Sequence, residues 1–263
     1  MRYTVKDLIK KKSTEKIVAM TCYTVQYSKT LDNYADLLLV GDSLGMVIYG
    51  HNNTLSVTMR MMIDHGKAVV KSTKKSLIAI DMPYGSYEKD KFRALENASH
   101  ILEETNACAV KLEGGADITE TVEFLTQKGI CVIGHVGLMP QKVKKNEKFK
   151  LKGNDKEEEK KILTDAKSLV EAGASLIVLE AIPERLGRKI TKNSDIPTIG
   201  IGAGRFCDGQ ILVTEDLLGI FDQFTPKFVK KYANLKSEID FAVKKYHKEV
   251  KNGNFPSLKN IYK

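Results

Sequence analysis

Apolar runs of strand length recur along the chain, and each one ends in a polar or glycine-containing segment. The run within 35–40 stops at Gly41, and Asp42 and Ser43 follow at once. A run that is apolar at consecutive positions is typical of a strand buried on both faces, as in parallel sheets. Runs of this kind predict eight strands, at 17–21, 35–40, 77–81, 108–113, 130–133, 175–180, 197–201 and 210–213.

Segments with helical spacing separate these strands. Thr4, Thr58 and Asp90 each stand where a side chain can cap a helix, and the first of these helices is expected to close one end of a barrel. Further helices are expected near 119–127, near 155–172, after Pro183, and twice at the C-terminus, whereas 48–58 reads as a long polar loop. Alternating strands and helices predict the α/β class, as a single-domain (βα)8 TIM barrel over 1–263 with a short N-terminal helix and a C-terminal helical extension. A doubly wound open sheet is the structural alternative.

Composition agrees with one large core and restricts the cellular setting. The chain has 263 residues, 42% of them hydrophobic, and its four cysteines form no CxxC pair. This spacing argues against a disulfide framework and against a structural zinc site. No apolar run approaches the ~18 residues of a membrane span, and no secretory leader is apparent. The sequence therefore predicts a cytoplasmic protein without membrane partners.

The net charge of +9 raises the question of nucleic acid. Only six of the 42 basic residues are arginine, the usual reader of bases and phosphates. The lysines gather in 142–161, where Glu157 to Glu159 interrupt them, and in the C-terminal tail. Alternating charge of this kind is typical of a solvated face, so we expect no nucleic-acid partner.

Four predicted strands end in acids: Asp42, Asp81, Glu113 and Glu180. Any one of them could simply cap the next helix. In a closed parallel barrel, however, the carboxyl ends of all strands meet at one mouth, where barrel enzymes place their chemistry. We therefore expect these four acids to converge.

Converging carboxylates repel one another and require a positive partner. Oxygen ligands without soft donors suit a hard cation, and a site that also binds substrate oxygens suits Mg²⁺. Lys111 lies two residues before Glu113, hence on the same strand face, and either pairs with a carboxylate substrate or forms a structural bridge to an aspartate. This combination of acids, a hard cation and a buried lysine predicts enolate formation from a 2-oxo acid, with a remaining carboxylate as base. His135 is equally compatible with a site residue and with a satisfied strand-end histidine.

Six segments in order resemble the 3-methyl-2-oxobutanoate hydroxymethyltransferase (ketopantoate hydroxymethyltransferase) family, over about residues 3 to 250. They are 40–45 (VGDSLG), 81–83 (DMP), 110–115 (VKLEGG), 134–141 (GHVGLMPQ), 179–183 (LEAIP) and 199–204 (IGIGAG). The resemblance implies a barrel of the phosphoenolpyruvate/pyruvate type, Mg²⁺ as cofactor, and 5,10-methylenetetrahydrofolate as one-carbon co-substrate. It implies formation of 2-dehydropantoate from 3-methyl-2-oxobutanoate in pantothenate and coenzyme A synthesis, by a homo-oligomer, often a decamer.

Carried over by position, the resemblance also assigns roles to residues. Metal binding falls to Asp42, Asp81 and Glu113, substrate binding to Asp42, Ser43, Asp81 and Lys111, and removal of the C3 proton to Glu180. The alternative is a Mg-dependent 2-oxo acid lyase or mutase of the isocitrate lyase/phosphoenolpyruvate mutase type, but the Lys-Lys-Cys-Gly-His segment of isocitrate lyases does not occur. A barrel that has lost catalysis would be expected to lack some of the four acids.

Overall fold

The computed structural model describes residues 2–143, 150–221 and 225–262. Eight parallel strands pair in chain order, and β8 pairs with β1, which closes the barrel. The predicted (βα)8 barrel is therefore confirmed, and the open sheet is excluded. The strands are β1 (Ile17–Thr21), β2 (Leu37–Val40), β3 (Leu77–Asp81), β4 (Ala109–Glu113), β5 (Val132–Gly137), β6 (Leu176–Glu180), β7 (Thr198–Ile201) and β8 (Gly209–Leu212).

Apolar side chains fill the barrel where the strands begin. Ile17, Leu37, Leu77 and Leu176 belong to one buried cluster, and each is the first residue of its strand. Leu8 from α1 (Val5–Lys11) joins the same cluster, so the N-terminal helix closes this end of the barrel as expected. Because this end is filled, polar chemistry is left to the opposite end, where the strands finish.

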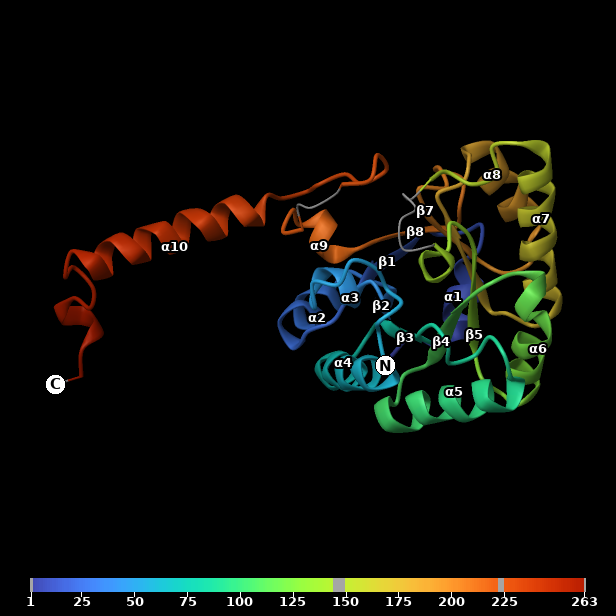
Figure 1. Cartoon of the computed structure of the whole chain (residues 1–263), viewed down its shortest axis with the longest axis horizontal. Helices are drawn as coiled ribbons and strands as arrows, with labels where there is room; N and C mark the ends of the chain where they lie inside the picture. Colours follow the sequence, from blue (N-terminus) through green and yellow to red (C-terminus); the bar gives the residue numbers. More distant parts are fainter. Residues whose placement is uncertain (1, 144–149, 222–224, 263) are drawn as a thin grey trace. The chain divides into compact units, whose positions relative to one another are not determined.

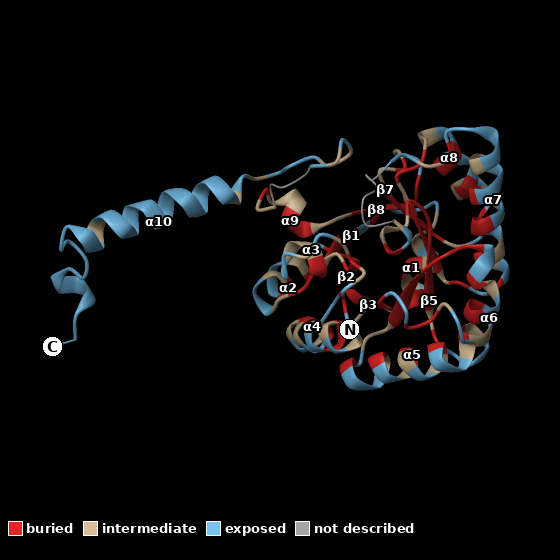
Figure 2. Ribbon diagram, in the orientation of Figure 1, coloured by how far each residue is buried: buried red, intermediate tan, exposed pale blue. Residues whose placement is uncertain are grey.

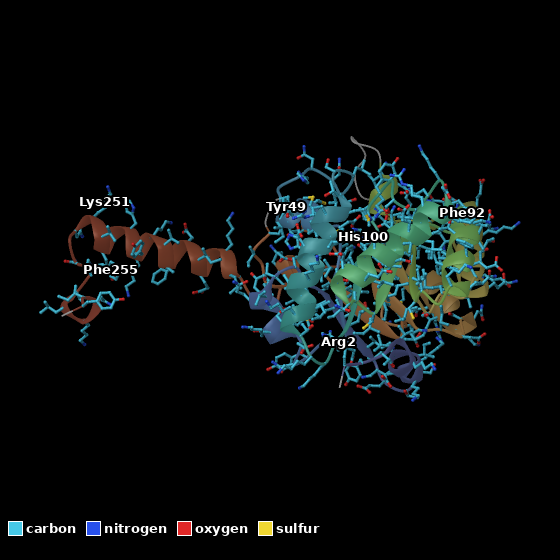
Figure 3. All side chains as sticks on the ribbon, turned by 90° about the horizontal axis from the view of Figure 1, so that it is seen from below. Arg2, Tyr49, Phe92, His100, Lys251 and Phe255 are labelled. Atoms are coloured by element: carbon cyan, nitrogen blue, oxygen red, sulfur yellow. The ribbon has the colours of Figure 1, made fainter. Side chains whose placement is uncertain are left out.

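Helices surround the barrel on the outside (Figure 1). Their starts are set locally: Thr4, Thr58 and Asp90 each accept a hydrogen bond from a backbone N–H of the first turn, as predicted. Arg2, labelled in Figure 3, donates to carbonyl oxygens at the end of α4 and so ties the N-terminus to that helix. The outer helices are α2 (Val25–Leu31), α3 (Leu44–Val47), α4 (Met59–Ser72), α5 (Lys91–Thr105), α6 (Thr119–Gln127), α7 (Lys156–Glu171) and α8 (Glu184–Asn193), with short 3-10 turns η1 (Ala116–Ile118) and η2 (Pro140–Lys142).

The fifth strand differs from the prediction. The apolar run predicted 130–133, whereas β5 covers Val132–Gly137. The strand continues through Gly134 and Gly137 because it lies between β4 and β6 and pairs with both. Glycine has little intrinsic preference for strands, so only this pairing reveals the extension. His135 therefore lies within the strand.

Contacts group the chain into two compact units, 1–213 and 214–263. The first is the barrel. The second contains α9 (Thr214–Leu217), α10 (Leu235–Lys251) and the turn η3 (Leu258–Asn260), in agreement with the two helical segments expected there. No residue of α10 is buried, as the colouring of Figure 2 shows. The expectation of one domain over 1–263 stays a prediction.

No helix among the described residues is long and apolar enough to cross a membrane. The lysine-rich loop singled out at 142–161 falls partly on 144–149, outside the described residues. Its remaining part leads into α7, which Asp155 caps.

Candidate active site

The four acids predicted to converge stand where strands finish. Asp81, Glu113 and Glu180 are the last residues of β3, β4 and β6, and Asp42 follows β2 by two positions. Asp42, Asp81 and Glu113 are almost completely buried. Ionised groups are rarely buried unless they are paired, so the interactions of these side chains decide what the site can do.

Lys111 is the central cation of this group. Its Nζ lies 3.1 Å from Asp81 Oδ1 and 3.6 Å from Glu113 Oε1. Burial alone would lower the pKa of Lys111, but Asp81, Glu113 and Asp42 outweigh burial and raise that pKa above its ordinary value. The ammonium is therefore charged, and the Lys–Asp bridge weighed from the sequence is present.

His135 joins Glu113 to Glu180. Its Nδ1 lies 3.3 Å from Glu113 Oε1, and its Nε2 lies 3.3 Å from Glu180 Oε2. Burial and Lys111 would lower the pKa of His135, but the two glutamates outweigh them and raise it to about 9. The ring is thus a cation between two carboxylates, which places His135 among the site residues.

Asp42 lies on the other side of Asp81. The backbone N–H of Asp42 donates to Asp81 Oδ2 at 3.0 Å, and Gln141 Nε2 donates to Asp42 Oδ2 at 2.9 Å. Burial, followed by the charges of Asp81 and Glu113, raises the pKa of Asp42 well above its ordinary value. The pKa of Asp81 is also raised, chiefly by burial. The surroundings therefore disfavour the ionised forms of these two carboxyl groups.

Glu113 is the best compensated of the acids. Burial would raise its pKa, but Lys111 and His135 outweigh burial and lower it. One oxygen, Oε1, faces these two cations, and the other accepts the backbone N–H of Gln141 at 3.0 Å. Both carboxylate oxygens are thus engaged within the protein, and the role of Glu113 as a metal ligand stays a prediction.

The donor set fits a hard cation held by few protein ligands. Within the described ranges, no three His, Cys, Asp or Glu side chains are arranged to hold one metal ion together. Asp81 Oδ1, however, is buried with the Lys111 ammonium at 3.1 Å as its charged partner, and the raised pKa of Asp42 beside it shows that the ionised carboxylate there lacks a cation of its own. Mg²⁺ is commonly bound through one or two carboxylates, with waters and substrate oxygens completing its shell. Asp42 and Asp81 would be the protein ligands of such an ion.

Ser43 and Glu180 lie at the edge of the cluster. The hydroxyl of Ser43 is 2.7 Å from that of Tyr23, a residue the sequence did not single out. Glu180 is more exposed than the other acids, at 16% of its side chain. The following residue, Ala181, has a φ of 47°, in the left-handed region that is costly for any residue with a Cβ. The chain therefore turns sharply directly after Glu180.

Two further residues of the site, Tyr87 and Gln141, received no role from the sequence. Tyr87 is in the loop before α5, and Gln141 is in η2 after β5. Both are buried and hydrogen-bonded to the acids or to their backbone. The only sequence signal for Gln141 is that it ends one of the segments that carry the family resemblance. Tyr87 lies in none of these segments, so nothing in the sequence singled it out.

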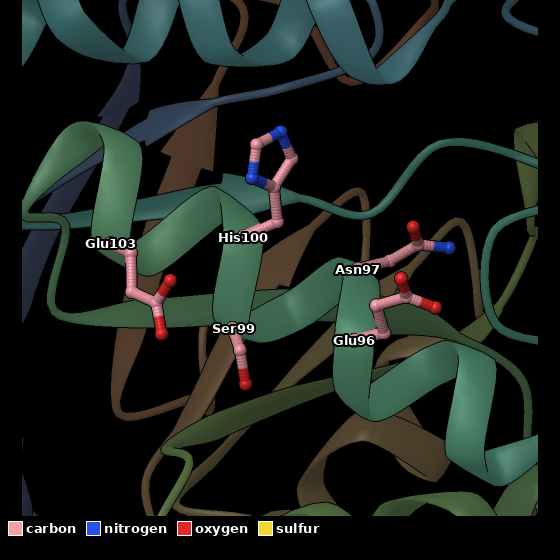
Figure 4. Close-up of a pocket in the computed structure, with 5 residues that line it drawn as sticks. All are labelled: Glu96, Asn97, Ser99, His100 and Glu103. Atoms are coloured by element: carbon pink, nitrogen blue, oxygen red, sulfur yellow. The ribbon is translucent and has the colours of Figure 1, made fainter.

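A separate hollow on the outer surface is unrelated to this cluster. It is lined by Glu96, Asn97, Ser99, His100 and Glu103, all on α5 (Figure 4). These five side chains come from one helix, whereas the acids of the cluster are gathered from the ends of four strands. The chemistry is therefore assigned to the strand ends.

A closed parallel barrel with buried acids and cations at the carboxyl ends of its strands defines a (βα)8-barrel enzyme. Solved structures share this fold. Phosphoenolpyruvate phosphomutase from Streptomyces platensis subsp. rosaceus has a TM-score of 0.63 at 10% identity, over 95% of this chain and 88% of that one. A 2,3-dimethylmalate lyase, a PEP mutase/isocitrate lyase superfamily member, has a TM-score of 0.61 at 12% identity, over 98% and 88%. At such identities the likeness concerns the fold alone.

The chain belongs to the ketopantoate hydroxymethyltransferase family, which it matches over residues 2–258. The 3-methyl-2-oxobutanoate hydroxymethyltransferase of Rhizobium rhizogenes is 48% identical, over 99% of this chain and 96% of the relative. The corresponding protein of Rhodospirillum rubrum is 47% identical, over 99% and 95%. The resemblance stated from six short segments is thereby confirmed over nearly the whole chain.

Proposed function

We propose that this chain transfers a hydroxymethyl unit from 5,10-methylenetetrahydrofolate to 3-methyl-2-oxobutanoate in pantothenate synthesis. The reaction consumes one water and yields 2-dehydropantoate and tetrahydrofolate. Family membership supports the reaction, and relatives nearly half identical over their full length carry the corresponding name. The observation that supports the chemistry is the buried cluster of Asp42, Asp81, Lys111, His135 and Glu180 at the strand ends.

Each side chain has a part in this proposal. Glu180 removes the proton from C3 of the substrate, and the cationic ring of His135, 3.3 Å away, orients the carboxylate that accepts it. Lys111 and Ser43 contact the carboxylate and keto end of the substrate. Asp42 and Asp81 hold Mg²⁺, which supplies Lewis acidity toward the keto group when bound. The C3 carbanion equivalent then forms the new carbon–carbon bond with the one-carbon unit.

The proposal includes the setting expected from the sequence: a cytoplasmic homo-oligomer acting on small molecules. Glu113 remains the candidate third metal ligand, reached through a change in its contacts with Lys111 and His135. The direct test is mass-spectrometric detection of 2-dehydropantoate from the two substrates, with and without Mg²⁺. Full turnover after exhaustive chelation would contradict the metal assignment. Cleavage or rearrangement of a 2-oxo acid without folate would instead identify a lyase or mutase.

The role of Glu180 is tested by proton exchange without folate. Glu180→Gln keeps the shape of the side chain, but an amide cannot take up the proton. We expect exchange of the C3 proton of 3-methyl-2-oxobutanoate in heavy water to fall by about 10²–10⁴-fold, the usual contribution of a general base. NMR follows the loss of the C3 signal. Glu184→Gln is the matched control, because Glu184 is half-exposed on α8 and pairs with Arg205.

Substrate affinity should change little in Glu180→Gln, since a base contributes mainly in the transition state. Exchange at the wild-type rate in this variant would show that Glu180 is not the base. His135 would then be the next candidate.

A further inference from the structure

Gln141 connects residues that are distant in the sequence. Its Nε2 donates to Asp42 Oδ2 at 2.9 Å and to the carbonyl oxygen of Met82 at 3.0 Å. Its backbone N–H donates to Glu113 Oε2 at 3.0 Å. A single buried residue thus contacts two acids of the site and the chain directly after Asp81. Its Oε1 is left to accept one more hydrogen bond.

That remaining bond comes from Tyr87. The Tyr87 hydroxyl lies 2.6 Å from Gln141 Oε1, and it accepts the backbone N–H of Glu113 at 3.0 Å. A phenol has one proton, so a hydroxyl that already accepts from an N–H donates to one carbonyl oxygen. Gln141 Oε1, at 2.6 Å, is closer than the Glu113 carbonyl oxygen at 3.0 Å. Tyr87 therefore donates to Gln141.

This donation determines which way the Gln141 amide faces. With Oε1 held by Tyr87, both hydrogens of Nε2 point at acceptors, namely Asp42 and Met82. The opposite orientation would set the amide oxygen against a carboxylate and a carbonyl, with no donor on that side. A buried acceptor left in this way costs about 1–3 kcal/mol. Tyr87 thus acts on Asp42 through Gln141.

The donors in this arrangement are neutral. Lys111 is 3.1 Å from Asp81, whereas Asp42 Oδ2 is held by an amide rather than by an ammonium. An amide restrains the rotation of a carboxylate without neutralising its charge, so the carboxylate stays attractive to a cation. Hydrogen-bond partners of metal ligands orient them in this way, and their removal typically weakens metal binding by about 10–100-fold.

We propose that Tyr87 and Gln141 are a positioning pair, which orients Asp42 and Glu113 for a hard divalent cation at the barrel mouth. The inference rests on the proposed function for the identity of the site, but it concerns cation binding rather than turnover. Both residues act on the site through their hydrogen bonds to Asp42 and Glu113. The pair joins the loops after β3 and β5 to the ends of β2 and β4, so it also holds four neighbouring strand ends in one geometry.

The test measures Mn²⁺ binding by electron paramagnetic resonance, with Mn²⁺ alone as the probe. Tyr87→Phe removes one hydroxyl and keeps the ring that fills the space. We expect the Kd for Mn²⁺ to rise by about 10–100-fold. The matched control is Tyr49→Phe, which loses a hydroxyl contact to His65 outside this network and should leave the Kd unchanged. The unfolding midpoint of Tyr87→Phe in chelator should be the lower of the two, because this variant leaves Gln141 Oε1 and the Glu113 N–H buried without a partner. The Kd is therefore measured where both variants are fully folded.

The second variant, Gln141→Met, removes donor and acceptor together at similar volume. The double variant should weaken Mn²⁺ binding by less than the product of the two single effects, since Tyr87 acts partly through Gln141. An unchanged Kd for Mn²⁺ in Tyr87→Phe would overturn the inference. So would a rise in Kd that is fully explained by the fraction of this variant that is unfolded in chelator. The two proposals can fail separately. If the variants bind Mn²⁺ more weakly than the wild type but the wild type forms no 2-dehydropantoate, the proposed function is wrong and the positioning role of Tyr87 and Gln141 is supported.

Discussion

At the scale of single residues, the barrel mouth is an arrangement of buried charges that depend on one another. Lys111 contacts Asp81 and Glu113, and His135 contacts Glu113 and Glu180. Removing one partner of such a network leaves a buried charge uncompensated, which is costly. Substitutions at these positions will therefore alter several pKa values at once. Variants with smaller electrostatic changes, such as Tyr87→Phe, separate the individual effects better.

Glu215, in the second unit, allows a cleaner electrostatic test. It is buried, and neither carboxylate oxygen has a hydrogen-bond partner within the described part of the chain. Burial raises the pKa of Glu215 from its ordinary 4.5 to about 7. Between these two values the unfolded chain releases the proton while the folded chain retains it. The contribution of Glu215 to the free energy of unfolding therefore falls as the pH rises from 4.5 to 7 and is constant above that.

We expect Glu215→Gln to be more stable than the wild type at pH 8 by about 3 kcal/mol, at ~1.4 kcal/mol per pKa unit, and similar at pH 4.5. Urea unfolding at a series of pH values measures this difference. Glu238→Gln, at an exposed position of α10, is the control. If the free energy of unfolding depended on pH in the same way for the wild type and for Glu215→Gln, the raised pKa of Glu215 would be refuted.

At the scale of elements, the pairing of β5 with β6 brings His135 to Glu180. Gly137 is opposite Glu180 in this pairing and has a φ of 100°, which favours glycine. A Cβ at position 137 would overlap the carbonyl oxygen of Glu180, which accepts the N–H of Leu138 at 2.9 Å. The close approach of the two strands at their carboxyl ends therefore requires glycine here.

Gly137→Ala should lower the free energy of unfolding by about 2–6 kcal/mol, because backbone strain and overpacking add. Gly129→Ala is a matched control: Gly129 has a φ of 83°, but a Cβ there meets nothing within 4 Å. Strain alone should cost that variant about 1–2 kcal/mol. Urea unfolding compares the two, and equal losses would show that the contact with Glu180 is not the reason for glycine at 137.

At the scale of the whole molecule, we expect the homo-oligomer proposed above. Within α10, Ile239, Phe241, Val243 and Tyr246 are all more than half exposed. Large apolar surface of this kind is typical of regions that contact other chains. Light scattering after size exclusion should report a mass several times 29.4 kDa. A monomer at micromolar concentration would contradict the expectation.

The order of the elements was predictable because its causes are local. Buried parallel strands are apolar at consecutive positions, and side chains such as Thr58 and Asp90 cap the helix that begins directly after them. Alternation of such segments predicts a closed barrel, and the geometry of a barrel brings strand-end acids to one mouth. The bounds of β5 were predicted wrongly because glycine has little intrinsic preference for strands.

The sequence by itself determined the barrel, the residue types at its mouth and, through the resemblance, the family. Only the tertiary structure decided how those residues interact. The Tyr87 hydroxyl, Gln141 and Asp42 come from loops up to 99 positions apart, so no spacing along the chain relates them. The same holds for His135 between Glu113 and Glu180, which depends on the register of three strands. Local patterns encode elements, whereas the protonation and orientation of buried groups depend on neighbours that folding brings together.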